Sequence, residues 1–149
     1  MEKLTINLGF TEFPPFYTCS GGNRSPVVRI KGLQCSSLAI VALNPFEPCC
    51  SFAAWLIWNL EPAEVIPEGI PPLPVVSVPV RAVQGKNDYG NIGYAAPCPP
   101  LGKMIRYTFK VYGLDTDLDL AAGSSKEAFF PALQGHVLQY GDTIAMARG

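Results

Sequence analysis

The 149-residue sequence contains few charged residues and a single histidine, and these two shortages exclude several classes of protein. Charged residues make up 15% of the chain and the formal net charge is -1, whereas about 25% of an average soluble domain is charged. No run of Lys or Arg is present, so binding to nucleic acid, which needs clustered cations against the phosphates, is not expected. With one His and no C-x-x-C pair, a zinc site lacks its usual ligands, and no metal or other cofactor is expected.

Long apolar segments are also missing. The longest apolar stretches, Leu38–Leu43 and Phe52–Trp58, are too short to cross a bilayer, and the first ten residues lack the apolar core of a signal peptide. These absences predict a cytoplasmic protein with no integral membrane insertion. In that compartment cysteines are expected as reduced thiols. The five cysteines are Cys19, Cys35, Cys49, Cys50 and Cys98.

Apolar residues and turn-forming residues are abundant instead. Hydrophobic residues make up 48% of the chain, which is enough to bury one core, so residues 1–149 are expected to form a single domain. The 14 glycines and 15 prolines exceed the roughly 12% expected from average usage. This composition indicates many turns and few long helices.

The apolar pattern predicts a mainly β protein, because short apolar or alternating segments recur between Gly, Pro and Asn residues. Met104–Leu114 alternates in its middle, with residues 105, 107, 109 and 111 on one face. Leu38–Leu43 and Ala53–Leu60 are apolar on both faces, as central strands are. The predicted strands are Leu4–Leu8, Ser25–Ile30, Ser37–Leu43, Ala53–Leu60, Met104–Leu114 and Val137–Met146.

Two segments do not fit strands. Prolines throughout Glu61–Pro79 predict a long, extended surface connection, since proline cannot donate to a sheet ladder. The sequence near Ser125–Leu133 is the one helix candidate, with Ser124 or Ser125 as its cap. Pro131 should keep this helix short or kinked.

A series of short strings is spaced along most of the chain. In order they are Asn23-Arg24-Ser25-Pro26, Asn44-Pro45-Phe46-Glu47-Pro48, Ala54-Trp55, Asn87-Asp88-Tyr89-Gly90, Pro97-Cys98-Pro99-Pro100, Ile105-Arg106-Tyr107 and Gly135-His136. The series resembles the phosphatidylethanolamine-binding protein (PEBP) family in its bacterial and archaeal Raf-kinase-inhibitor-like branch, whose pattern runs N-x-SP, DPDAP, HW, NDYG, GPCPP, HRY and GH. The resemblance implies a PEBP-like antiparallel β-sandwich with Greek-key connections and one short C-terminal helix.

The resemblance also implies a small anion pocket, and this sequence departs from the family pattern there. The family's ligand-site Asp and two His positions hold Asn44, Ala54 and Ile105. Asn44 keeps the hydrogen-bonding reach but loses the charge, and Ala54 can neither donate nor carry charge. The expected pocket residues are Asn44, Pro45, Phe52, Ala54, Ala96, Pro97, Cys98, Ile105 and Tyr107. Such a pocket should bind phosphate-bearing head groups weakly and be more apolar than the family's.

Other roles follow from the same resemblance. Arg106 is expected on the face opposite Ile105, in a structural ion pair with Glu47. The turn at residues 87–90 should brace the pocket, and His136 should be structural. A bridge from Cys49 or Cys50 to Cys98 is left open, because both loops flank the pocket in the family.

The main functional prediction is a non-enzymatic ligand-binding or inhibitory module, with a small ligand or anion held weakly in the pocket. No catalytic residues are expected, because no acid–base pair, phosphate cradle or nucleophile elbow is visible. The alternative is a protein-interaction module that inhibits a serine protease or kinase through surface loops, especially residues 61–79. A homodimer is left open by analogy with bacterial relatives.

Overall fold

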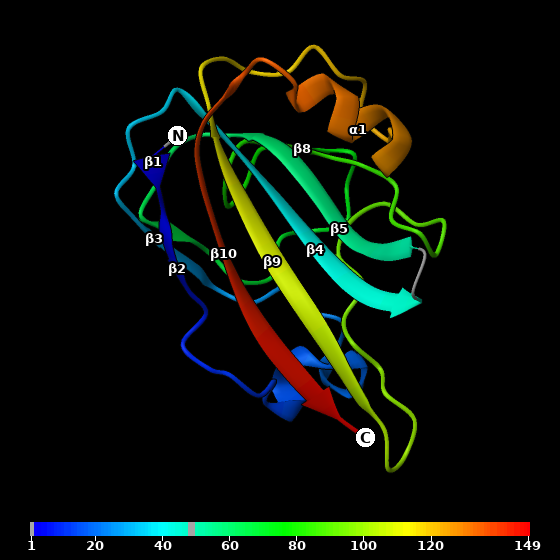
Figure 1. Cartoon of the computed structure of the whole chain (residues 1–149). Coiled ribbons are helices and arrows are strands. Elements are labelled where there is room, and N and C mark those ends of the chain that lie inside the picture. Colours follow the sequence, from blue (N-terminus) through cyan, green and yellow to red (C-terminus); the bar gives the residue numbers. More distant parts are fainter. Residues whose placement is uncertain (1, 48–49) are drawn as a thin grey trace.

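The computed structural model describes residues 2–47 and 50–149, with only the backbone described at 45–47, 50 and 51. Its strands form a seven-stranded and a three-stranded sheet (Figure 1). The large sheet has the order β1 (Glu2–Lys3), β10 (Val137–Arg148), β9 (Met104–Leu114), β4 (Ser37–Glu47), β5 (Cys50–Leu60), β8 (Ala82–Gln84) and β7 (Val75–Val76). The small sheet has the order β2 (Thr5–Asn7), β3 (Val28–Lys31) and β6 (Val65–Ile66). The mainly β prediction is confirmed.

The long strands β4, β5 and β9 form the middle of the large sheet. Ala42 of β4 lies opposite Trp55 of β5 on one side and Phe109 of β9 on the other, and all three are fully buried. Apolar residues on both faces suit a strand with layers on both sides, which confirms the predicted central position of β4 and β5. In β9 the residues with odd numbers from 107 to 111 are buried, while the even ones are partly exposed, as the alternation predicted.

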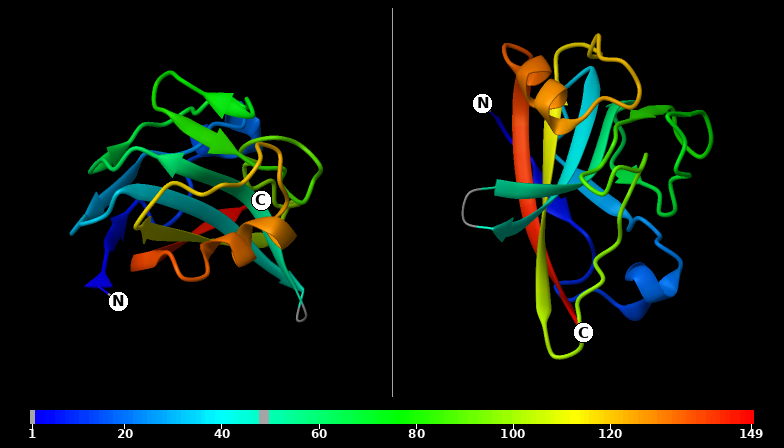
Figure 2. Two further views of the ribbon diagram at one scale, coloured as in Figure 1. Left: turned by 90° about the horizontal axis from the view of Figure 1, so that it is seen from above. Right: turned by 90° about the vertical axis from the view of Figure 1, so that its right-hand side faces the viewer.

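Each face of the large sheet covers a separate core. One core lies against the small sheet and contains Ile6, Ile30 and Phe109, whereas the other lies beneath the helix and contains Trp58 and Phe129. Figure 2 shows the helix and the small sheet on opposite sides of the long strands. The long strands therefore form the middle layer, and they position the loops and side chains at their ends.

The helix α1 (Lys126–Leu133) lies where it was predicted and is short. Ser125 occupies its N-cap position, but its side chain makes no capping hydrogen bond, so the predicted capping role of this side chain is wrong. Pro131 lies inside the helix, which ends two residues later. Within residues 2–47 and 50–149, no helix has the length and apolar character needed to cross a membrane.

The short strands are where the sequence-based prediction was wrong. Residues 61–79 were expected to be a connection only, yet they contain β6 and β7, and β8 was not predicted at all. These strands are two or three residues long, so no alternating pattern can identify them. The second predicted strand starts at Val28 instead of Ser25. The Ser25 hydroxyl and carbonyl accept hydrogen bonds from the Ile70 and Gly69 amides, outside the ladder.

Candidate ligand-binding site

A groove opens where the β4–β5 hairpin separates from β9. The pairing between β4 and β9 ends at Leu43 and Thr108, while β9 continues to Met104 against β10. Beyond that point the hairpin turns away from the sheet, as the right-hand view of Figure 2 shows. The groove has a volume of about 520 Å³ and is lined by Asn44, Pro100, Lys103, Met104, Ile105, Arg106 and Met146.

Two of the three altered family positions line this groove. Asn44 lies near the end of β4 and Ile105 near the start of β9, and both side chains are half-buried. The third position, Ala54, is fully buried in the core beside Trp55. The fold therefore brings Asn44 and Ile105 to one surface and closes Ala54 off from it.

Tyr107 was an expected pocket residue, but its hydroxyl is already bonded within the protein. Its Oη donates to the carbonyl oxygen of Ala95 at 2.7 Å, and the side chain is only 2% exposed. The Ala95 amide in turn donates to the Ala54 carbonyl at 2.8 Å. Burial raises the pKa of Tyr107, with a smaller contribution from Tyr89, so the group stays neutral. Tyr107 therefore belongs to the buried inner wall of the groove, formed with Ala54 and Ala95, and its hydroxyl hydrogen is not available to a ligand.

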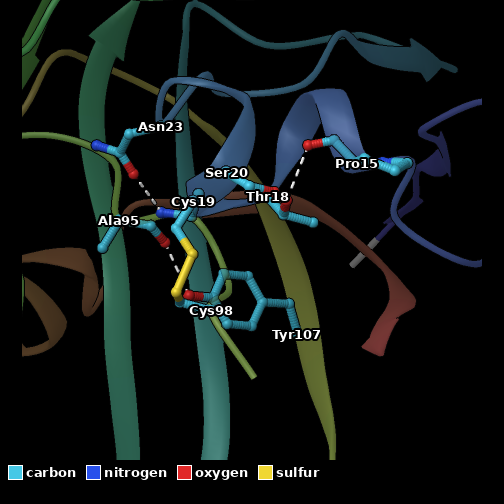
Figure 3. The surroundings of a disulfide bond; sticks show 9 residues. Pro15, Thr18, Cys19, Ser20, Asn23, Ala95, Cys98 and Tyr107 are labelled. Carbon is cyan, nitrogen blue, oxygen red and sulfur yellow. Dashed lines mark hydrogen bonds between the residues drawn. A yellow bond between two sulfur atoms is a disulfide. The ribbon is translucent and has the colours of Figure 1, made fainter. Parts of the chain in front are cut away.

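The predicted rim at residues 96–98 is divided between the interior and the surface. Ala96 and Pro97 are buried, whereas Cys98 is exposed. Cys98 forms a disulfide with Cys19 (Figure 3), and the Cα atoms of the two residues are 5.2 Å apart. The expectation of reduced thiols is therefore wrong for these two residues. Their separation of 79 residues shows why: the sequence does not reveal a pairing between loops that only the fold brings together.

The alternative bridge to Cys98 is also wrong, because its sulfur is bonded to Cys19. Of the two proposed partners, Cys49 and the side chain of Cys50 lie outside the described residues. Among the described cysteines, Cys35 is free and half-buried.

Asn23 provides a second link between the same two loops. Its side-chain amide donates to the Tyr94 carbonyl at 2.8 Å, and its Oδ1 accepts from the Ala96 amide at 2.6 Å. Asn23 also has a φ of 57°, a left-handed conformation that Asn tolerates better than most residues. The sequence analysis identified this Asn only as part of a motif and missed its role as a brace. Together with the disulfide, Asn23 holds the loop at residues 94–98 in place.

The turn at residues 87–90 holds β5 from the other side. The Asn87 side chain is buried and its Oδ1 accepts from the amides of Tyr89 and Asn91. Asp88 Oδ2 accepts from the Ala53 amide at 2.8 Å and forms an ion pair with Lys126 at 2.7 Å. Because Ala53 precedes Ala54, this turn holds the strand that carries the altered position, while its predicted role in bracing the pocket stays a prediction.

Of the remaining predicted residues, Phe52 lies apart from the groove and two side chains lie outside the description. Phe52 is half-buried and packs edge-on against Tyr89, with ring centroids 4.6 Å apart. The side chains of Pro45 and Glu47 lie outside the described residues. Arg106 is exposed, and its ion pair with Glu47 stays a prediction.

His136 lies far from the groove. Its Nδ1 is 2.9 Å from Asp115 Oδ1, and the adjacent Val137 pairs with Leu114 at the end of β9 opposite Ile105. In the described part of the chain, no group of three His, Cys, Asp or Glu side chains could hold a metal ion.

The groove contains residues that the sequence analysis did not assign to a site. Met104 and Arg106 are on the outer face of β9, Lys103 precedes this strand, and Met146 belongs to β10. The only sequence signal for these groove residues was the alternation of β9, which places residues 104 and 106 on the same face of the strand. Both ionisable side chains among the described lining residues are cations. The groove thus combines an apolar wall with positive charge at its rim.

Comparison with known proteins agrees with this architecture. The family model described as phosphatidylethanolamine-binding protein matches residues 9–147. A UPF0098 protein of Pyrococcus abyssi is 42% identical over 150 residues, covering 98% of this chain and 84% of the relative. A UPF0098 protein of Pyrococcus horikoshii is 43% identical over 153 residues, covering 97% and 77%.

Two solved structures have the same overall fold. A putative PEBP homologue of Chlamydia trachomatis, CT736, superposes with a TM-score of 0.83 at 28% identity, covering 99% of this chain and 97% of that one. YbcL of Escherichia coli superposes with a TM-score of 0.82 at 24% identity, covering 99% and 98%. At 24% identity, the similarity to YbcL shows a shared fold and nothing further. The β-sandwich expected from the sequence motifs is confirmed by these neighbours.

Proposed function

The chain belongs to the phosphatidylethanolamine-binding protein family, and we propose that it is a non-enzymatic ligand-binding module of that family with a degenerate anion pocket. The observation that supports this most directly is the closure of the inner wall. Ala54 is fully buried, and the Tyr107 hydroxyl is bonded to the Ala95 carbonyl. Neither residue can offer a donor to a ligand, so the groove should bind phosphate-bearing head groups weakly and favour more apolar ligands.

The energetic reason lies in the kind of donor that remains. A hydrogen bond to a charged group contributes about 1.5–3 kcal/mol, whereas one between neutral groups contributes about 1 kcal/mol. Asn44 is the one altered position that keeps a polar side chain in the groove, and it is neutral. A phosphate at the family position would therefore lose its charge-assisted contacts and keep one neutral contact.

The non-enzymatic part of the proposal has its own support. Cys98 cannot act as a thiolate nucleophile while it is bonded to Cys19. His136 contacts Asp115 at the end of β9 away from Ile105, so it cannot act as a base in the groove. A screen of esterase and protease substrates should show no turnover, and turnover would contradict this part.

Phosphate titration of the native protein and a revertant tests the proposed pocket. Phosphate, phosphorylethanolamine and a matched neutral analogue are titrated in thermal-shift experiments against the native protein and the variant Asn44→Asp/Ile105→His. Both positions are half-buried, so the variant can accept the new side chains. Ala54→His is left out, because a larger side chain at a fully buried position would overpack the core.

The revertant should be stabilised by phosphate and the native protein should not. A ligand at about 100 times its Kd stabilises the folded state by roughly 2.7 kcal/mol, which a thermal shift readily detects. The matched control is Asn91→Asp/Val65→His, which makes the same kinds of change at exposed positions outside the groove. An equal response of the native protein to phosphate would show that the pocket is not degenerate.

A second candidate function is inhibition of a serine protease or kinase through surface loops. The observation in its favour is the apolar surface of residues 71–79, where Leu73, Val75 and Val78 are 51%, 61% and 78% exposed. Exposed apolar surface of this kind marks interaction sites when it is contiguous. A homodimer through the same surface is a further proposal, which light scattering at several concentrations tests.

A comparison of loop and groove variants separates the two functions. Leu73→Ser/Val75→Ser should abolish inhibition of a target protease or kinase, while Ile105→His should leave it unchanged. If the groove variant loses inhibition and the loop variant keeps it, the inhibitory surface is the groove and not the loop.

A further inference from the structure

We propose that the groove binds an amphiphile with a single anionic head group, held by Lys103 and Arg106, with its tail against Pro100, Met104 and Met146. The inference rests on the proposed ligand-binding function and names both the class of ligand and the groups that recognise its charge. These groups differ from the positions that the family uses, because Lys103 and Arg106 lie at the outer rim of the groove.

The charge of the groove favours an anion. Lys103 and Arg106 are both exposed, and neither forms an ion pair within the described part of the chain. Arg106 is taken as available to a ligand, in place of the pair with Glu47 that the sequence analysis expected. No acidic side chain is among the described lining residues. A cationic ligand would meet repulsion there, and a neutral one would leave both charges unused.

The position of the two cations separates them from the family pocket. The alternation of β9 places Ile105 against the core and Arg106 on the outer face. Lys103 lies in the turn before this strand and is also exposed. An anion held by these two side chains therefore lies at the mouth of the groove, whereas the family positions lie deeper.

The apolar lining explains why the ligand needs a tail. Exposed ion pairs contribute little free energy because water screens them, so a small anion alone would bind weakly. Met104 is 51% exposed and Met146 is half-buried beside it, and methionine adapts its shape to irregular apolar partners. The free energy gained by burying apolar surface grows with the area buried, which makes the tail the larger source of affinity.

The size of the groove is compatible with this class of ligand. Its volume is about 520 Å³, within the range of about 300–1,000 Å³ for small-molecule sites. Leu101, which lies between the lining residues Pro100 and Lys103 in the sequence, is 94% exposed and adds an apolar side chain to this turn.

Three ligands with the same tail test the proposal. Octanoate, 1-octanol and octyltrimethylammonium are titrated by calorimetry, and binding is located from the NMR shifts of the amides of residues 101–106 and 146. We expect octanoate to bind about tenfold more tightly than octanol, and octyltrimethylammonium to bind most weakly. The advantage of octanoate should shrink at high salt, because exposed charges are screened. Inorganic phosphate tests the head group without a tail and should bind more weakly than octanoate.

Two variants separate the head-group contacts from the tail contacts. Lys103→Gln/Arg106→Gln should remove the tenfold advantage of octanoate and leave octanol binding unchanged. The control Arg29→Gln/Lys31→Gln makes the same change in net charge at exposed positions of β3 in the other sheet, and it should leave all three affinities unchanged. Met104→Gln/Met146→Gln should weaken all three ligands together.

The outcomes distinguish this inference from the proposed function. Equal affinity for octanoate and octanol, or unchanged octanoate binding by the Lys103→Gln/Arg106→Gln variant, would overturn the inference and leave a ligand-binding groove in place. Absence of any ligand-dependent amide shift in residues 101–106 would overturn both.

Binding of the protein to lipid vesicles distinguishes a membrane lipid from a free amphiphile as the source of the ligand. Retention of the protein on phosphatidylglycerol vesicles that octanoate competes away would support a membrane lipid as the source, and octanoate binding without retention would support a free amphiphile.

Discussion

Tyr94 and Tyr107 are both buried in the core between the sheets, but their hydroxyl groups are in opposite situations. Tyr107 donates to the Ala95 carbonyl at 2.7 Å. Tyr94 is 4% exposed and packs edge-on against Trp55, and within the described part of the chain its hydroxyl has no partner. A buried polar group without a hydrogen bond costs free energy, while a bonded one does not.

The same substitution should therefore have opposite effects at these two positions. Tyr107→Phe removes the donor and leaves the Ala95 carbonyl without it, so it should lower the free energy of unfolding by about 1–2 kcal/mol. Tyr94→Phe removes only an unbonded group and should be neutral or stabilising by up to about 1 kcal/mol. Urea unfolding of both variants measures this. A larger loss for Tyr94→Phe than for Tyr107→Phe would contradict the assignment.

These tyrosines also predict how stability depends on pH. Burial raises the pKa of both Tyr94 and Tyr107 above the usual value of 10.0. As pH rises through about 10, the unfolded chain loses the tyrosine protons first and the folded chain retains them, so the free energy of unfolding must fall. We expect stability to be constant below about pH 9 and to decrease above pH 10. Tyr107→Phe should make the decrease shallower, and an unchanged slope would show that other groups cause it.

At the scale of elements, Asp88 connects three segments that are distant in sequence. Its side chain accepts from the Ala53 amide of β5 and pairs with Lys126 at the start of α1, while its own amide donates to the Ala53 carbonyl. The carboxylate and Lys126 are partly buried, at 20% and 26% exposure, so water screens the pair only in part. The turn, the central strand and the helix are held together by this one side chain.

Asp88→Ala should remove both side-chain contacts, to the Ala53 amide and to Lys126, and leave the backbone hydrogen bond of residue 88 in place. A charge-assisted hydrogen bond contributes about 1.5–3 kcal/mol, so we expect a loss of roughly 2 kcal/mol in the free energy of unfolding. Hydrogen exchange should also accelerate in α1 before the rest of the sheet. The control Asp117→Ala removes an exposed ion pair with Arg81 and should cost less than about 1 kcal/mol. Similar losses for the two variants would contradict the role given to Asp88.

For the whole molecule, the Cys19–Cys98 disulfide is a covalent link between distant parts of the chain. It joins the η2 turn (Cys19–Gly21), between β2 and β3, to the loop before β9. Asn23 reinforces the same link with two hydrogen bonds to residues 94 and 96. A cross-link over 79 residues removes conformational entropy from the unfolded chain.

Removing the disulfide should destabilise the whole fold. In the entropic treatment a loop of this length contributes about 4.5 kcal/mol, and measured effects are often smaller. We expect Cys19→Ser/Cys98→Ser to lower Tm, and reductant to lower the Tm of the native protein towards that of the variant. Cys35→Ser changes a free thiol and serves as the control. A native Tm that does not respond to reductant would contradict a formed and stabilising bond.

The sequence by itself determined the large features of this protein. The apolar runs of β4 and β5 and the alternation of β9 were sufficient to predict central strands, because side-chain burial in a long strand repeats every two residues. The motifs along the chain identified the family, which the comparisons confirm over residues 9–147, and they located the changes at Asn44, Ala54 and Ile105.

The tertiary structure alone decided which of those three positions can contact a ligand. It placed Asn44 and Ile105 on a groove with Lys103, Arg106 and Met146, and it buried Ala54. It also paired Cys19 with Cys98 and formed the two- and three-residue strands β6, β7 and β8. These features depend on which distant segments meet, and local residue patterns do not contain that information.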